Sequence, residues 1–136
     1  MRLIPEAMRL ALRANAIAHH DAQLFGHVDL DPAPVVKLFN PVGAATWLAT
    51  ELDEDGDTLF GLADLGFGCP ELGYFSLAEI AAVRLPFGLH IERDEAFATD
   101  VPLSRWADVA RRKGSIILAQ AALACPHPLP PDPSDG

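Results

Sequence analysis

The sequence predicts an α+β fold, with a mainly antiparallel sheet of four or five strands and helices packed on one side of it. Short apolar runs separated by turn residues are concentrated between residues 35 and 94, which is typical of hairpin-linked strands. Apolar residues recur at helical spacing on both sides of that region. The length of 136 residues and the hydrophobic content of 50 % suit one packed domain.

We expect this domain to span residues 1–125, followed by a disordered proline-rich tail over residues 126–136. Cys69 and Cys125 match no metal-binding or redox spacing and are expected to be free thiols. No apolar run is long enough to span a bilayer, and the first residues lack the apolar core of a secretory signal. These features favour a cytoplasmic protein with no membrane contact.

The first helix is predicted to open at Pro5 and Glu6, since proline suits a first turn and an acid there complements the helix dipole. Its basic side comprises Arg2, Arg9, Arg13 and His20. We expect this side to be a solvated stripe, or alternatively a docking surface for an acidic partner.

A loop is expected next, and its potential metal ligands are His19, His20, Asp21, His27, Asp29 and Asp31. Such residues can bind zinc or manganese, but their spacing is irregular. The sequence therefore predicts a solvated loop and no metal site.

Four strands and one further extended segment are predicted, at residues 35–39, 46–50, 58–64, 71–75 and 89–94. Asp55 and Gly56 lie between two of them and indicate a hairpin turn. A calcium loop at this place would need an acid at Leu62, so that alternative is rejected. The residues expected to form much of the core are Phe39, Trp47, Leu48, Leu59, Leu62, Tyr74, Phe75, Ile80 and Phe87.

Three helices are predicted after the second strand pair. Ser76 and Glu79 form a capping box that starts a short helix. A second helix covers residues 103–113 and ends at Gly114. The third covers residues 116–124 and is apolar all round, so it either fills the core or is covered by a second copy or a partner.

The net charge of −9 is distributed unevenly, with +2 over residues 1–20, −12 over residues 21–100, +3 over residues 101–125 and −2 over residues 126–136. An acidic middle argues against direct nucleic-acid binding, which needs a basic footprint. It suits a basic protein partner, or basic ends that pack on the middle.

Six motifs in this order resemble a bacterial family of small domains known as domain of unknown function 2958. They are KLFNP (37–41), ATWL (45–48), FGL (60–62), ELGYFSL (71–77), PFGL (86–89) and IERD (91–94). The resemblance implies a bacterial cytoplasmic protein, often encoded on plasmids or other mobile elements. It implies no activity and no cofactor.

Alternation in the last extended segment predicts that His90, Glu92 and Asp94 share one face and that Arg93 faces the core. A buried arginine needs a carboxylate, and the expected partner is one of Glu71, Asp64 and Glu51. Arg93 is then either part of a structural ion pair or an anion-binding residue in a cleft. The candidate cleft comprises Lys37, Glu71, Tyr74, Glu92 and Arg93.

Cys69, Ser76 and Ser104 are the available nucleophiles, but no nucleophile elbow is present, so acyl-transfer chemistry is not predicted. The first function hypothesis is a non-enzymatic protein-interaction or regulatory module of a mobile element. Its partner is another protein, or a second copy bound through residues 116–124.

One form of this hypothesis is an acidic inhibitor of a nucleic-acid-binding protein, with Asp53, Asp55 and Asp57 on one face beside Glu92 and Asp94. The alternative is a small-molecule- or metal-binding domain, or an enzyme, with its polar cleft around Glu92 and Arg93.

Overall fold

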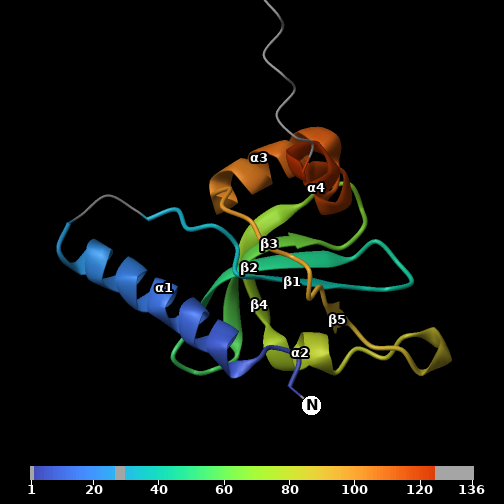
Figure 1. Ribbon diagram of the computed structural model, residues 1–136, viewed down its shortest axis with the longest axis horizontal. Helices are drawn as coiled ribbons and strands as arrows, with labels where there is room; N and C mark the ends of the chain where they lie inside the picture. The colour runs from blue at the N-terminus through green and yellow to red at the C-terminus, as the bar shows by residue number, and fades with distance from the viewer. Residues whose placement is uncertain (1, 27–29, 125–136) are drawn as a thin grey trace, which may run out of the picture.

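The computed structural model describes residues 2–26 and 30–124, and its centre is a five-stranded antiparallel sheet of order β4-β3-β2-β1-β5 (Figure 1). The strands are β1 (Val36–Phe39), β2 (Thr46–Leu52), β3 (Thr58–Asp64), β4 (Glu71–Ser76) and β5 (Glu92–Arg93). The predicted α+β class and antiparallel sheet are confirmed. The predicted tail, Cys125, His27 and Asp29 lie outside the described residues.

The helices are α1 (Glu6–Leu24), α2 (Leu77–Ala81), α3 (Leu103–Lys113) and α4 (Ile116–Ala124), with a 3-10 turn η1 (Pro86–Gly88). Ser76 caps α2 as predicted, because its Oγ accepts a hydrogen bond from the Glu79 amide at 3.1 Å. Gly114 ends α3 with a left-handed φ of 87°, which glycine adopts without strain. None of these helices is both long and apolar enough to cross a membrane.

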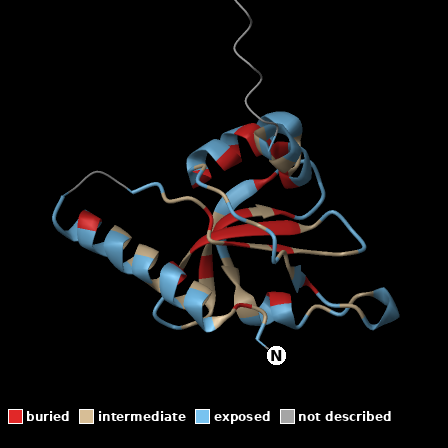
Figure 2. Ribbon diagram, in the orientation of Figure 1, coloured by how far each residue is buried: buried red, intermediate tan, exposed pale blue. Residues whose placement is uncertain are grey.

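The helices cover both faces of the sheet, so the prediction that they pack on one side is wrong. On β2, Trp47 belongs to a core cluster with Leu12 of α1, whereas the neighbouring Leu48 packs with Trp106 of α3. Successive side chains of a strand point to opposite faces, and both faces of β2 are therefore buried (Figure 2). Consecutive apolar residues in a central strand, here Trp47, Leu48 and Ala49, are typical of this double coverage.

The first helix extends further than predicted and takes in His19, His20 and Asp21, which were expected in a loop. Polar side chains of α1 dock it against the part of β2 that extends past β1. The Arg13 guanidinium donates to the Leu52 carbonyl at 2.7 Å, and the Asn15 amide donates to the Thr50 carbonyl at 2.9 Å.

Arg9 likewise donates to the Gly56 carbonyl at 3.1 Å. Two of the basic residues of α1 thus pack on the acidic middle of the chain instead of forming a solvated stripe. Because Arg13 and Asn15 donate to carbonyls of β2 past the end of β1, α1 shields this end of β2.

Two residues expected in the core are exposed. Tyr74 is 75 % exposed because β4 is an edge strand. Phe87 is 93 % exposed and has a left-handed φ of 63° within η1, which protrudes from the sheet. The hydrophobicity of both side chains suggested burial, but their positions at an edge and in a turn leave them in solvent.

Candidate functional site

The five residues of the predicted cleft do not lie together. Glu71 and Tyr74 are on β4, whereas Glu92 and Arg93 are on β5 at the opposite edge of the sheet. Lys37 is next to Leu38, which pairs with Arg93, so the Lys37 and Arg93 side chains leave opposite faces. Three strands separate the two halves of the predicted site.

Lys37 is held by contacts on its own face of the sheet. Its Nζ donates to Gln120 Oε1 at 2.7 Å and lies 3.3 Å from Asp94 Oδ2. It also lies 5.5 Å from the centroid of the Phe39 ring. This ammonium joins β1, α4 and the segment after β5, which accounts for it as a structural residue.

At the β5 edge, the prediction that Arg93 faces the core side is confirmed, since it pairs with the buried Leu38. The expected carboxylate partners are wrong. The ion pair that Arg93 makes is with Glu95, at 3.6 Å between Nη2 and Oε1. Its Nε is buried and has no hydrogen-bond partner among the described residues.

The three carboxylates expected to pair with Arg93 either bind other groups or lie on another strand. Glu51 binds His19 Nδ1 at 3.0 Å, and Glu71 begins the far edge strand. Asp64 is fully buried, and its carboxylate accepts the Gly66 and Ile116 amides, each at 2.9 Å. Asp64 thereby ties the loop after β3 to the first turn of α4.

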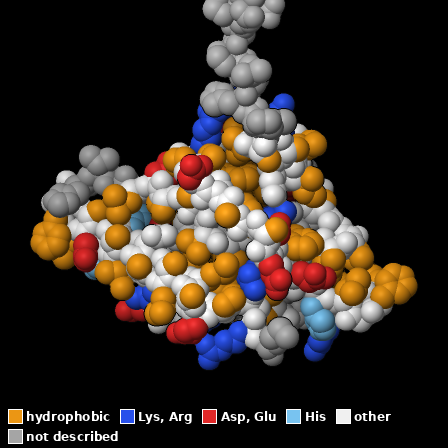
Figure 3. All heavy atoms as spheres, viewed as in Figure 1, with side chains coloured by type: hydrophobic (Ala, Val, Ile, Leu, Met, Phe, Trp, Pro, Cys, Tyr) orange, Lys and Arg blue, Asp and Glu red, His pale blue; other side chains and the backbone are white. Residues whose placement is uncertain are grey.

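A cleft of about 510 Å³ adjoins Arg93, and we term it the β5-edge cleft. Its lining residues are Arg2, Leu3, Ala81, His90, Ile91, Glu92, Arg93 and Glu95. Acidic, basic and histidine side chains gather beside one another in this part of the surface (Figure 3). The cleft therefore combines apolar walls with charges of both signs.

The acidic residues of the β2–β3 hairpin stabilise the turn. Asp55 accepts the Asp57 and Thr58 amides and the Thr58 hydroxyl. The Thr58 side-chain hydrogen bond, followed by the two backbone hydrogen bonds, lowers the pKa of Asp55 below its ordinary value. Asp57 accepts the Ser76 hydroxyl and the Ala78 amide, and therefore anchors α2.

These aspartates do not form one face with Glu92 and Asp94. The hairpin follows Leu52 at one end of β2, whereas Glu92 pairs with Phe39, which itself pairs with Thr46 at the other end. Asp94 forms an ion pair with Lys37. This distribution counts against an acidic inhibitory face.

The β4 edge is open and partly apolar. The side of β4 away from β3 pairs with no strand of the described chain. Exposed apolar side chains on this strand and the loop before it are Leu65, Phe67, Leu72 and Tyr74. The Tyr74 ring rests against Phe60, with centroids 5.0 Å apart.

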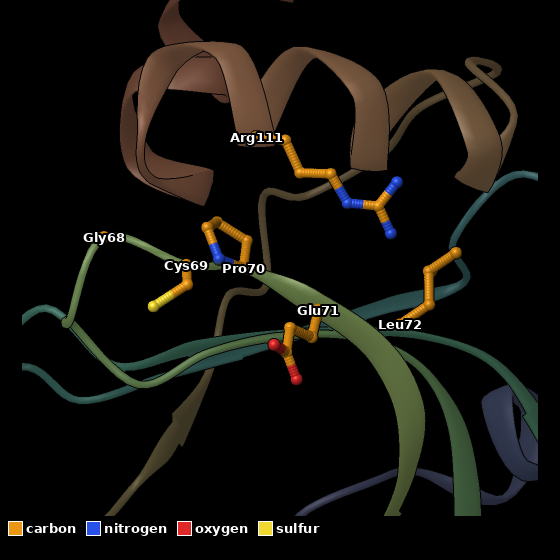
Figure 4. A pocket seen from close by; sticks show the side chains of 6 residues that line it. All are labelled: Gly68, Cys69, Pro70, Glu71, Leu72 and Arg111. Atoms are coloured by element: carbon orange, nitrogen blue, oxygen red, sulfur yellow. The ribbon is translucent and has the colours of Figure 1, made fainter.

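A hollow of about 510 Å³ lies between the start of β4 and α3 (Figure 4). Arg111 reaches from α3 toward Leu72, whereas the Glu71 carboxylate and the Cys69 sulfur point away from it. Because these groups diverge, the hollow has no catalytic arrangement.

The α4 helix is buried on one face only. Ile116 and Ala119 pack in the core, while Ile117 and Leu118 are about half exposed. Hydrophobic side chains are visible over this helix in Figure 3. The expectation that α4 fills the core therefore holds for one face, and a second copy or partner on the other face stays a prediction.

A cleft that the sequence did not predict lies between α1 and the sheet. It has a volume of about 400 Å³ and includes His19, Glu51, Phe60 and Tyr74 in its lining. The continuation of α1 past Ile17 brings His19 to Glu51. The helical spacing could have been followed in the sequence as far as His19, but its pairing with Glu51 depends on the tertiary fold.

Potential metal ligands and the candidate nucleophiles are not grouped together in residues 2–26 and 30–124. These residues contain no cluster of three or more histidine, cysteine or acidic side chains that could hold a metal ion. Ser76 is used as a helix cap, Ser104 hydrogen bonds to Asp31, and the Cys69 sulfur lies 3.5 Å from the Phe67 carbonyl. None of the three nucleophiles contacts a histidine in the described part of the chain.

The fold and these surfaces define a small α+β domain with an antiparallel sheet covered on both faces. The family described as "Protein of unknown function (DUF2958)" matches residues 3–117, and the chain belongs to that family. This confirms the resemblance seen in the sequence motifs. No curated protein and no solved structure matched the chain.

Proposed function

We propose that this chain is a non-enzymatic protein-interaction module that binds an extended segment of its partner along β4. The observation that carries the proposal is a six-residue edge strand whose outer side pairs with no strand among residues 2–26 and 30–124. Unpaired backbone amides and carbonyls at such an edge are a ready template for another strand. The partner's backbone supplies the complementary hydrogen bonds.

Apart from the charged Glu71 at its first position, the strand lacks the usual protection against such pairing. Natural proteins shield edges with lysine, proline, bulges or very short strands. Between Glu71 and Ser76 there is no lysine and no proline, and the ladder to β3 is regular throughout. An edge left open in a folded domain therefore suits a binding role.

The side chains beside β4 indicate the chemistry of the partner. Leu72 and Tyr74 offer apolar contact, and the exposed Arg111 makes no ion pair within the described chain. We expect an extended segment with apolar side chains over Leu72 and Tyr74 and an acidic side chain near Arg111.

The test uses the double variant Leu72→Lys/Tyr74→Lys, with Phe87→Lys as matched control. Two lysines on β4 should abolish recovery of the partner in affinity capture, because they remove apolar contact and disfavour edge pairing. Phe87 is at least as exposed but distant from β4 in sequence, so its replacement should leave recovery unchanged.

Hydrogen exchange locates the contact in the same complex. Binding along β4 should slow exchange by at least about tenfold for the amides in residues 71–76 that point away from β3, since these gain a hydrogen-bonded neighbour. Equal recovery by the β4 variant and the wild type, with no added protection of β4, excludes this mode of binding.

A second copy of the chain is a further expected partner, bound through the exposed side of Ile116–Ala124. Ile117 and Leu118 provide the apolar contact. Light scattering after size-exclusion chromatography should show a dimer that Ile117→Glu/Leu118→Glu converts to a monomer. A wild type that is monomeric at high concentration removes this part of the proposal.

The proposal also includes a bacterial, cytoplasmic setting and an association with plasmids or other mobile elements. These parts rest on the family resemblance alone. Sequencing the genes that flank the coding region checks the association with a mobile element, and cell fractionation checks the location.

A further inference from the structure

Arg93 has hydrogen-bonding capacity that the described chain does not use. Its side chain is 19 % exposed, yet the guanidinium makes no hydrogen bond to any described residue and its Nε is buried. An arginine carries five N–H donors in a planar fork, and buried donors are normally paired. Such an arginine is suited to receive an acceptor from outside the chain.

The contact with Glu95 is weak. The two side chains approach to 3.6 Å, which exceeds hydrogen-bonding distance, and the Glu95 side chain is 84 % exposed. Exposed ion pairs of this kind contribute little. Glu95 can therefore move away from Arg93 when a stronger acceptor binds.

The surroundings of Arg93 restrict what can bind. The walls of the β5-edge cleft include the apolar side chains of Leu3, Ala81 and Ile91, and its volume of about 510 Å³ suits a small organic molecule. Glu92 and Glu95 add negative charge, which disfavours a multiply charged phosphate. The nearby Arg2 is paired with Glu6 at 3.1 Å.

We propose that the β5-edge cleft binds a carboxylate group attached to an apolar body. The Arg93 guanidinium donates to the carboxylate, and the apolar body packs against Leu3, Ala81 and Ile91. Two sources share this chemistry, namely a small organic acid and the C-terminal carboxylate of a peptide. This site is independent of the binding along β4.

The experiment titrates the ¹⁵N-labelled full chain with sodium hexanoate and follows its amide resonances. Saturable shifts are expected for residues 91–95 and for Ala81. A peptide ending in a free leucine, its C-terminally amidated form, and inorganic phosphate are titrated in parallel. Binding of hexanoate identifies an organic acid as sufficient, whereas binding of the free peptide alone identifies a chain terminus.

Three variants test the role of Arg93. Arg93→Gln should weaken hexanoate binding at least tenfold, and Glu95→Gln should strengthen it severalfold by removing the competing carboxylate. Arg105→Gln removes an exposed arginine on α3 and should have no effect. Should Arg93→Gln not fold, Arg93→Lys and Glu95→Gln decide the matter, because the first should weaken binding and the second should strengthen it.

The proposal is overturned by the absence of saturable shifts at the cleft with both hexanoate and the free peptide. Unchanged affinity in a folded Arg93 variant, or weaker binding in Glu95→Gln, also overturns it. Tighter binding of phosphate than of hexanoate rejects the carboxylate assignment. None of these results affects the β4 proposal, because the capture experiment uses a different edge and different variants.

Discussion

The two edges of the sheet differ in length, polarity and surroundings. The β4 edge has six residues, a regular ladder to β3 and exposed apolar side chains nearby. The β5 edge has two residues and adjoins a cleft with charges of both signs. A long open edge offers backbone pairing to another chain, whereas a short edge beside a cleft can only offer side chains.

The difference arises from how each strand joins the sheet. β4 follows β3 along the chain and pairs with it over its full length. β5 returns to β1 only after α2 and η1, and it pairs through Leu38 and Phe39 alone. The proposed polypeptide partner and the proposed carboxylate ligand are therefore assigned to opposite edges.

The largest expected effect separates the interior of the sheet from its β4 edge. Gly61 on β3 pairs with Gly73 on β4, but a Cβ at Gly61 would lie 1.8 Å from the Leu48 carbonyl oxygen, whereas a Cβ at Gly73 would meet nothing within 4 Å. Gly61→Ala should destabilise the fold by about 3 kcal/mol or more, and Gly73→Ala should change it by less than about 0.5 kcal/mol. Urea denaturation measures both. Similar losses in the two variants would show that the face of β4 at Gly73 is as closely packed as the interior of the sheet.

A smaller effect is expected from the residue that anchors the loop leading to β4. Asp64→Ala should lower the free energy of unfolding by about 2–3 kcal/mol, because two amides lose a buried carboxylate acceptor. Hydrogen exchange should increase at Gly66 and Ile116 and stay unchanged at β5. Asp64→Asn keeps one acceptor oxygen, so its free energy of unfolding should fall by less than that of Asp64→Ala. Equal loss of protection at both edges would contradict this local role.

The Ser76 cap of α2, at the end of β4, should contribute about 1 kcal/mol to the free energy of unfolding. Ser76→Ala removes the acceptor for the Glu79 amide and the hydroxyl that donates to Asp57. Ser76→Thr keeps the oxygen and serves as control. Thermal denaturation monitored by circular dichroism should rank the stabilities as wild type, threonine variant, alanine variant. An alanine variant as stable as the wild type would show that Ser76 does not stabilise the junction between β4 and α2.

The smallest expected effect is on the stability of the fold at low pH. Hydrogen bonds from Thr58 and Asp57 lower the pKa of Asp55 in the folded protein below its ordinary value near 3.8. The carboxylate therefore stabilises the fold above that value, and this contribution is lost as the pH falls through the lower folded pKa. The melting temperatures of the wild type and Asp55→Asn should differ at neutral pH and converge once the pH falls below the lowered folded pKa of Asp55. A difference that persists to the lowest pH would exclude this linkage.

The sequence predicted several local features accurately, including β3 over Thr58–Asp64, α3 over Leu103–Lys113 and the Ser76 cap. It also predicted that Arg93 faces the core side. These features depend on side-chain periodicity, turn residues and caps, which act between residues close in sequence.

The candidate site was not predicted to the same degree. Glu71 and Tyr74 were grouped with Glu92 and Arg93, yet the strand order places them at opposite edges. The same order, with α1 on one face and α3 on the other, overturned the one-sided arrangement of helices. Strand order is decided by pairing between residues far apart in the chain, and no local pattern records it.

The sequence by itself therefore determined the type and order of the elements and several of their ends, because local sterics and the burial of apolar faces impose them. Only the tertiary structure decided which elements are neighbours. That choice left β4 without a strand on its outer side and Arg93 without a hydrogen-bonding partner in the described chain, and both features depend on long-range packing.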